Sequence, residues 1–288
     1  MFEALLQQFV NGISVGLGYA LVALGLTLIF GVLHVINFGH GEIVMIGALS
    51  VLLVIDRLGV PYVAALPVAI IVGAAVGYVM NLVAVEPLAS RPGARTDVFL
   101  ATFAVGVLLH ETVLSTWGRA PALVAGLPGR TEIGPLSLTN HRIFVIVTAI
   151  IVLLVLEAMT RRTRFGVEMR AVAQSRFAAQ VVGIDIRKVS TWTFVLASAV
   201  AGLGGALLAP IMSFSPNIGE ASLLKGFAIV VIAGLGSAPG AVIAALLIGI
   251  IEAMLGFFID ARIVSGLVLS LMLVVLLLRP RGLFSSAT

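Results

Sequence analysis

The stretch RIFVIVTAIIVLLVLEAMT, residues 142–160, decides the fold class of this chain. Nearly all of its residues are apolar, and a helix needs roughly 20 such residues to cross the hydrocarbon core of a bilayer. Similar apolar stretches recur on both sides of it, at about 9–33, 40–55, 62–84, 98–116, 190–212, 222–257 and 262–278. The sequence therefore predicts an all-α, polytopic membrane helix bundle of about 8–9 segments, with residues 1–288 forming a single transmembrane domain.

The composition agrees with a membrane protein and excludes several other classes. The 288 residues are 60% hydrophobic and 10% charged, whereas soluble domains carry roughly 25% charged residues. Because the chain has no cysteine, it has no disulfide, no thiol nucleophile and no cysteine metal site. The first apolar segment begins with uncharged Gln7 and Gln8 and lacks a basic region and a cleavage site, so we expect it to remain in the mature protein.

The net charge of +4 is interpreted as a record of membrane orientation and not as a sign of nucleic-acid binding. Most basic residues fall in three places, which the positive-inside bias predicts to be cytoplasmic: Arg91 and Arg95; Arg161, Arg162, Arg164, Arg170, Arg176, Arg187 and Lys188; and Arg279 with Arg281. The loop at about 117–141, which is rich in proline and glycine, is then external. Counting spans backwards places the amino terminus outside, unless the first or second segment is re-entrant.

Two apolar regions are interrupted. The stretch 222–257 is too long for one straight span and contains Gly234, Gly236, Pro239 and Gly240, while the run GVLHVINFGHG at 31–41 places His34, Asn37 and His40 in an otherwise apolar sequence. Non-helical backbone at membrane depth occurs where protein or a water-filled cavity satisfies its polar groups. Paired interrupted helices are a sequence indicator of a transport path. We therefore predict broken helices near 31–41 and 234–240.

The polar and glycine residues at these breaks are the candidate path-lining residues. They are Asn37, His40, Gly41, Glu42, Gly234 and Gly236, to which we add Glu252 because it lies deep in apolar sequence. An alternative interpretation is local: Asn37 and Glu42 would cap the following helix at its positive end. Glu252 would, in the same way, either line the path or pair with a polar neighbour.

Residues 161–189, RRTRFGVEMRAVAQSRFAAQVVGIDIRKV, form the long cytoplasmic segment and predict a short helix between Gly166 and Gly183. One interpretation is a basic loop resting on anionic lipid headgroups. The other is a helix that docks on another protein. The small residues Ala171, Ala173, Ala178 and Ala179 favour docking, because lipid binding does not require them.

Signals for enzymatic activity fail on chemical grounds. Gly12–Gly16 matches the G-x-S-x-G string, but it lies within a helical apolar run and not at a strand-to-helix turn. His110 and Glu111 lack the second histidine of a helical zinc site, because position 114 is Leu114. Neither lysine of the chain belongs to a Gly-rich phosphate loop. We therefore expect no enzyme activity and no cofactor in this chain.

Several runs resemble one known family, the permease subunits of branched-chain (hydrophobic) amino acid ABC transporters, and most closely its smaller permease. They are GLTLIFGVLHVINFGHGEIVMIGA at 25–48, GVEMRAVAQSRFAAQVVGIDIRKV, FVLASAVAGLGGALLAP at 194–210, VVIAGLGSAPGAVIAALLIGIIE at 230–252 and RPRGLF at 279–284. The resemblance covers essentially the whole chain. Gly39 stands where relatives often carry alanine.

The resemblance implies a set of partners in a bacterial inner membrane. They are a second homologous permease, two cytoplasmic ATPase subunits that bind ATP and Mg, a periplasmic or lipid-anchored substrate-binding protein, and membrane lipid. It also implies an ATPase-coupling role for Gly166, Arg170, Ala171, Arg176, Ala178 and Gly183, with leucine, isoleucine and valine as default substrates.

Two other functions stay open from the sequence. An ion-coupled carrier or channel without an ATPase would use a buried group such as Glu42 or Glu252. An intramembrane hydrolase would need a buried pair of Ser14 with His34 or His40. The docking segment argues against the carrier or channel.

Overall fold

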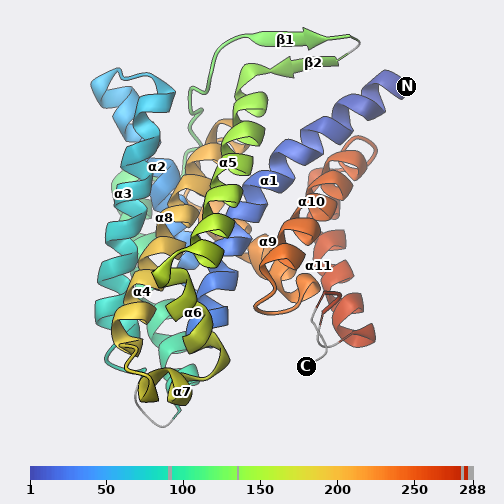
Figure 1. Cartoon of the computed structure of the whole chain (residues 1–288). Helices are drawn as coiled ribbons and strands as arrows, with labels where there is room; N and C mark the ends of the chain where they lie inside the picture. Colours follow the sequence, from blue (N-terminus) through green and yellow to red (C-terminus); the bar gives the residue numbers. More distant parts are fainter. Residues whose placement is uncertain (90–92, 135, 280–281, 285–288) are drawn as a thin grey trace.

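The protein is almost entirely helical, as the sequence predicts (Figure 1). A computed structural model describes residues 1–89, 93–134, 136–279 and 282–284. Its elements are α1 (Phe2–Leu33), α2 (His40–Leu58), α3 (Tyr62–Met80), the π-helix η1 (Asn81–Val85), α4 (Ala94–Trp117), β1 (Arg130–Ile133), β2 (Leu136–Thr139), α5 (Asn140–Arg162), α6 (Arg164–Gln174), α7 (Arg176–Val181), α8 (Ile186–Met212), α9 (Ile218–Ala233), α10 (Ala238–Leu255) and α11 (Ala261–Leu278).

Six helices in the described part of the chain are long and apolar enough to cross a membrane: α1, α3 together with η1, α4, α5, α8 and α10. The helix α11 is a shorter apolar helix. Two further helices of the bundle, α2 and α9, do not meet this criterion. The 19 residues of α2 include the charged residues Glu42, Asp56 and Arg57, and α9 is short, with 16 residues. The total of about 8–9 membrane segments therefore stays a prediction.

The core of the bundle is built around α1 and α8. In each of these two helices 78% of the residues of the apolar span are buried, compared with 17% in α5 and 22% in α4. The helix α1 packs mainly on α10 and α8, and α8 packs mainly on α3, α2 and α1. Since helices in lipid associate through close packing of small residues, glycines mark these contacts. A Cβ on Gly47 of α2 would lie 2.2 Å from the carbonyl oxygen of Gly202 in α8.

The two ends of the bundle differ in content (Figure 1). The amino terminus and the antiparallel hairpin β1–β2 lie at one end, whereas α6, α7, the start of α4 and the end of α11 lie at the other. The hairpin falls in the loop 117–141 that we expect to be external, and the second end carries Arg95 and the segment 161–189. Arg91 and Arg281 lie outside the described residues. This arrangement agrees with the predicted orientation, which itself stays a prediction.

The segment 161–189 differs from the prediction in one respect. We expected one helix between Gly166 and Gly183, but the structure has two, α6 and α7, on either side of Ser175. Ser175 has an extended backbone, and its Oγ accepts a hydrogen bond from the Ala178 N–H at 3.2 Å. A serine in this conformation starts a new helix, because its side chain satisfies a backbone donor that has no partner within the helix.

Candidate functional site

The first break folds the chain back into the bundle. The helix α1 ends at His34, whose φ of 57° is left-handed, and α2 begins at His40. The His40 Nε2 donates a hydrogen bond to the Val22 carbonyl oxygen at 3.1 Å. Val22 precedes the end of α1 by 11 residues, or about 16 Å of helix. Residues 34–39 therefore run back along α1, and α2 starts near mid-depth.

The fold-back segment, residues 34–39, is held by polar and aromatic contacts. The Phe38 N–H donates to Thr102 Oγ1 at 3.3 Å, and the Gly39 N–H donates to Asn37 Oδ1 at 3.0 Å. The Phe38 ring lies 4.6 Å from Phe99, 6.4 Å from Phe103 and 6.3 Å from Phe227 between centroids. Asn37 and His40 are fully buried.

The contacts of Asn37 and Glu42 bear on the capping interpretation. Asn37 bonds within the turn and does not cap α2, whose N-cap residue Gly39 has no side-chain bond. The Asn37 Nδ2 has no hydrogen-bond partner among the described residues. Glu42 does lie in the first turn of α2, and its Oε2 is also 3.5 Å from His110 Nδ1 on α4.

The second predicted break is a tight turn at the end of the bundle that carries α6 and α7. It covers residues 234–237, where Gly234 and Gly236 have φ of 99° and 91°, values that favour glycine. The amides of Leu283 and Phe284 donate to the carbonyls of Ile232 and Ala233 at 2.8 and 3.0 Å. A Cβ on Gly31 would lie 3.9 Å from the Gly236 Cα, so this turn lies near the end of α1. The structure does not bring Gly234 and Gly236 together with Asn37 and His40.

A third break, which was not predicted from the sequence, brings the start of α9 against the start of α2, directly after the fold-back segment. Residues 213–217 separate α8 from α9, with Ser213 at a φ of 65°. At the start of α9, a Cβ on Gly219 would lie 2.7 Å from the Gly41 carbonyl oxygen, and a Cβ on Gly41 would lie 2.4 Å from that of Gly219. The amino-terminal ends of α2 and α9 thus touch. The recurrence of Asn, Gly and Glu in NFGHGE (37–42) and NIGE (217–220) was the signal for this pairing.

Glu252 has a partner that the sequence analysis did not assign. Lys225 Nζ of α9 forms an ion pair with Glu252 of α10 and donates a hydrogen bond to the Tyr19 hydroxyl of α1 at 2.7 Å. Both charged side chains are mostly buried. Of the two interpretations of Glu252, pairing with a polar neighbour is the one that the geometry supports.

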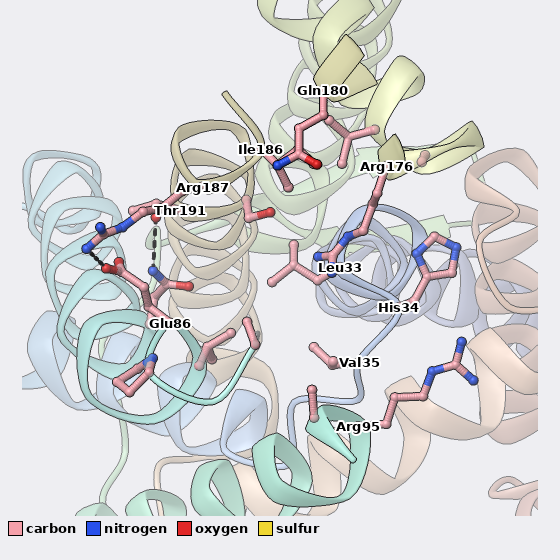
Figure 2. A pocket seen from close by; sticks show the side chains of 18 of the residues that line it. Leu33, His34, Val35, Glu86, Arg95, Arg176, Gln180, Ile186, Arg187 and Thr191 are labelled. Atoms are coloured by element: carbon pink, nitrogen blue, oxygen red, sulfur yellow. Dashed lines mark hydrogen bonds and ion pairs between the residues drawn. The ribbon is translucent and has the colours of Figure 1, made fainter. Parts of the chain in front are cut away.

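A cavity of about 1200 Å³ lies between the fold-back segment and the helices α6 and α7. Figure 2 shows Arg176 reaching from α7 toward Leu33 at the end of α1, with His34 and Arg95 on the same side of the cavity. On the opposite side Arg187 pairs with Glu86. Burial lowers the pKa of the Arg176 guanidinium. Arg176 thus points inward, and not out toward a docking partner.

The other candidate coupling residues divide into internal and exposed ones. Gly166 is buried where a Cβ would meet the Thr160 carbonyl oxygen at 2.3 Å, and Arg170 donates to that same oxygen. Ala171 packs against the core, and Gly183 has a φ of 84° that ends the segment. Ala178 is exposed, beside the exposed apolar side chains of Phe177, Val181 and Val182. We call these four residues the α7 surface.

Comparison with known proteins identifies the family. Residues 8–277 match the family described as "Branched-chain amino acid transport system / permease component". The chain belongs to this family. It is 32% identical to the high-affinity branched-chain amino acid transport system permease protein BraD of Pseudomonas aeruginosa, over 96% of this chain and 95% of the relative. It is 32% identical to LivH of Escherichia coli K12, over 98% of this chain and 96% of the relative.

This permease also resembles a longer kind of relative. It is 24% identical to the permease protein LivM of Escherichia coli K12, over 92% of this chain but 67% of the relative. The chain therefore has the length of the BraD and LivH relatives, which agrees with the smaller permease expected from the sequence. It is a multi-pass membrane protein and a transport subunit. Among its described residues, no group of three or more His, Cys, Asp or Glu could hold a metal ion.

Proposed function

We propose that this chain is the membrane-spanning permease subunit of an ATP-driven importer in the bacterial inner membrane, and that branched-chain or related amino acids cross the membrane through it. The observation that carries the proposal is the family match over residues 8–277, together with about 32% identity over nearly full length to branched-chain amino acid permeases. The partners are a second, homologous permease, two ATPase subunits that bind ATP and Mg, and a periplasmic or lipid-anchored substrate-binding protein.

The ATPase subunits dock on the α7 surface. Phe177, Val181 and Val182 expose large apolar side chains at the end of the bundle where the basic segment lies. Exposed apolar residues grouped in this way are characteristic of protein interfaces. Gly166, Arg170, Ala171 and Gly183 hold α6 and α7 in position, and Arg176 connects α7 to the end of α1 across the cavity. Movement of α7 on ATP binding thereby reaches the fold-back segment.

The solute path runs beside the fold-back segment, with Asn37, His40, Gly41 and Glu42 near its wall. Gly234 and Gly236 support the path indirectly by forming the turn between α9 and α10, and Glu252 does so by its ion pair with Lys225. An ion-coupled carrier or a channel is the alternative function. The family membership does not favour it, and the ion pair of Glu252 removes one of the two free carboxylates that it would use.

The docking proposal predicts the result of a co-purification experiment. We expect Phe177→Asp and Ala178→Trp to abolish binding of the ATPase subunits, because a charge or a bulky ring would disrupt an apolar contact at α7. The measurement is recovery of the ATPase subunits with amino-terminally tagged permease from mildly solubilised membranes. Leu123→Asp is the matched control, because Leu123 is similarly exposed, at 86% against 79% for Phe177, but lies in the loop at the other end.

Two results would contradict the proposal. ATPase subunits that remain bound to both α7 variants would show that the α7 surface is not the docking site. Wild-type permease that purifies alone and still passes amino acids across liposomes without ATP would favour the carrier or channel.

A further inference from the structure

Three ionisable side chains gather on one face of the bundle near mid-depth. Glu42 lies in the first turn of α2, His110 on α4, and Glu220 in the first turn of α9. The Glu42 and His110 side chains are 3.5 Å apart and retain 12% and 20% exposure. Glu220 is exposed and makes no ion pair among the described residues. Glu42 and Glu220 each directly follow one of the two glycines, Gly41 and Gly219, at which α2 and α9 touch.

The depth of this face follows from contacts with the middle of α1 and α4. The start of α2 is bonded to Val22 of α1, and a Cβ on Gly106 of α4 would lie 3.2 Å from Gly39 and 3.7 Å from Glu42. Gly219 at the start of α9 touches Gly41. The carboxylates are therefore far from either end of the bundle. At that depth, an ionisable group that faced lipid would be energetically costly.

Aromatic side chains surround the same place. Phe38 lies at the base of the face, with Phe99 and Phe103 of α4 and Phe227 of α9 around it at 4.6–6.4 Å between centroids. Asn37, one residue before Phe38, is fully buried and its Nδ2 has no hydrogen-bond partner among the described residues. The face therefore offers negative charge and aromatic rings.

The contrast with α5 shows which surface faces lipid. Between Arg142 and Glu157 this helix has no ionisable residue, and its exposed side chains are apolar: Val147, Ile150, Ile151, Leu154 and Val155. A surface of that kind suits the hydrocarbon core. The face with three ionisable groups does not, and it must be covered by water, solute or another protein.

We infer that the face formed by Glu42, His110 and Glu220, here called the acidic face, lines the solute path, and that its two carboxylates meet the ammonium group of the amino acid. The aromatic cluster around Phe38 receives the apolar side chain of the solute. This inference rests on the proposed transport function and assigns Glu220 and His110 to it. The similar placement of Glu42 and Glu220, each directly after a glycine in the first turn of its helix, provides two carboxylates that can share one cation.

Because the chain has no cysteine, single cysteines test the position of the path directly. Phe103→Cys places a thiol in the aromatic cluster around Phe38, and Leu224→Cys places one on α9 about one turn after Glu220; the two native side chains are 51% and 46% exposed. Ile151→Cys and Leu154→Cys place a thiol on α5, at residues that are 54% and 64% exposed. The assembled transporter in proteoliposomes is treated during ATP turnover with a charged, water-soluble methanethiosulfonate. We expect labelling at residues 103 and 224 to be at least about tenfold faster than on α5, because the reagent needs water.

The role of Glu220 is tested by uptake kinetics. We expect Glu220→Gln to raise the KM for amino acid at least about tenfold, with unchanged thermal stability and unchanged ATPase co-purification, and Glu220→Asp to restore much of the affinity. Glu111→Gln is the matched control, because Glu111 is also an exposed glutamate but is not one of the three residues that define the acidic face.

The outcomes separate this inference from the proposed function. Loss of ATPase subunits from the wild-type preparation would overturn the proposed function. An intact complex in which residues 103 and 224 label no faster than residues 151 and 154, or in which Glu220→Gln leaves KM unchanged, would overturn the acidic face alone.

Discussion

Replacing Lys225 by methionine is expected to destabilise the permease by about 3–5 kcal/mol, because the change leaves the Glu252 carboxylate mostly buried without its partner. Removing one member of a buried ion pair costs more than the pair contributes, since the remaining charge keeps its desolvation cost. The Tyr19 hydroxyl also loses the hydrogen bond that it accepts from Lys225. The measurement is the free energy of unfolding of the purified permease in one detergent.

A double variant and a surface variant complete this test. Lys225→Met with Glu252→Met is expected to recover most of the lost stability, because an apolar pair can replace a buried ion pair at little cost. Lys188→Met is the matched control, because Lys188 is an exposed lysine in the first turn of α8, and its expected change is within about 0.5 kcal/mol. A Lys225→Met variant as stable as wild type would show that the pair has no structural role.

Adding one methyl group at Gly47 is expected to lower stability by at least about 2–3 kcal/mol. The new Cβ would lie 2.2 Å from the Gly202 carbonyl oxygen and 2.5 Å from the Gly202 Cα, so α2 and α8 would have to separate along their contact. Backbone atoms cannot move aside as a flexible side chain can. The measurement is the midpoint of thermal unfolding of Gly47→Ala in detergent.

A glycine-to-alanine substitution in α11 should not lower the stability of the protein. A Cβ on Gly266 of α11 would meet nothing within 4 Å, so Gly266→Ala should be neutral or stabilise by up to about 1 kcal/mol through the higher helix propensity of alanine. Equal unfolding midpoints for the two variants would contradict the close α2–α8 contact.

The helices were predictable because the bilayer leaves few alternatives. A stretch such as 142–160 has one stable form in hydrocarbon, a helix with its backbone bonds satisfied internally, and the structure places α5 over Asn140–Arg162. The division of the apolar stretch 222–257 into two helices was also predictable, since glycine and proline at 234–240 mark the turn between α9 and α10. Both predictions depend on local sequence alone.

What the sequence did not reveal depends on contacts between distant residues. The interruption at 31–41 was predictable, but the direction in which the chain continues after it was not. The hydrogen bond from His40 to Val22 shows that the chain turns back along α1. Lys225 looked like an isolated lysine until α9 and α10 placed it beside Glu252. Ser175 ends one helix and caps the next through a single hydroxyl, a choice that the alanine-rich sequence around it does not indicate.

The bonds that Leu283 and Phe284 make to the end of α9 bear on how the chain is assembled during synthesis. The carbonyls of Ile232 and Ala233 belong to the last turn of a helix, where no intrahelical donor is available. Their partners are among the last described residues that the ribosome makes. Until those residues are synthesised, the carbonyls of Ile232 and Ala233 lack these two donors, so we expect the α9–α10 turn to be completed late in the assembly of the permease.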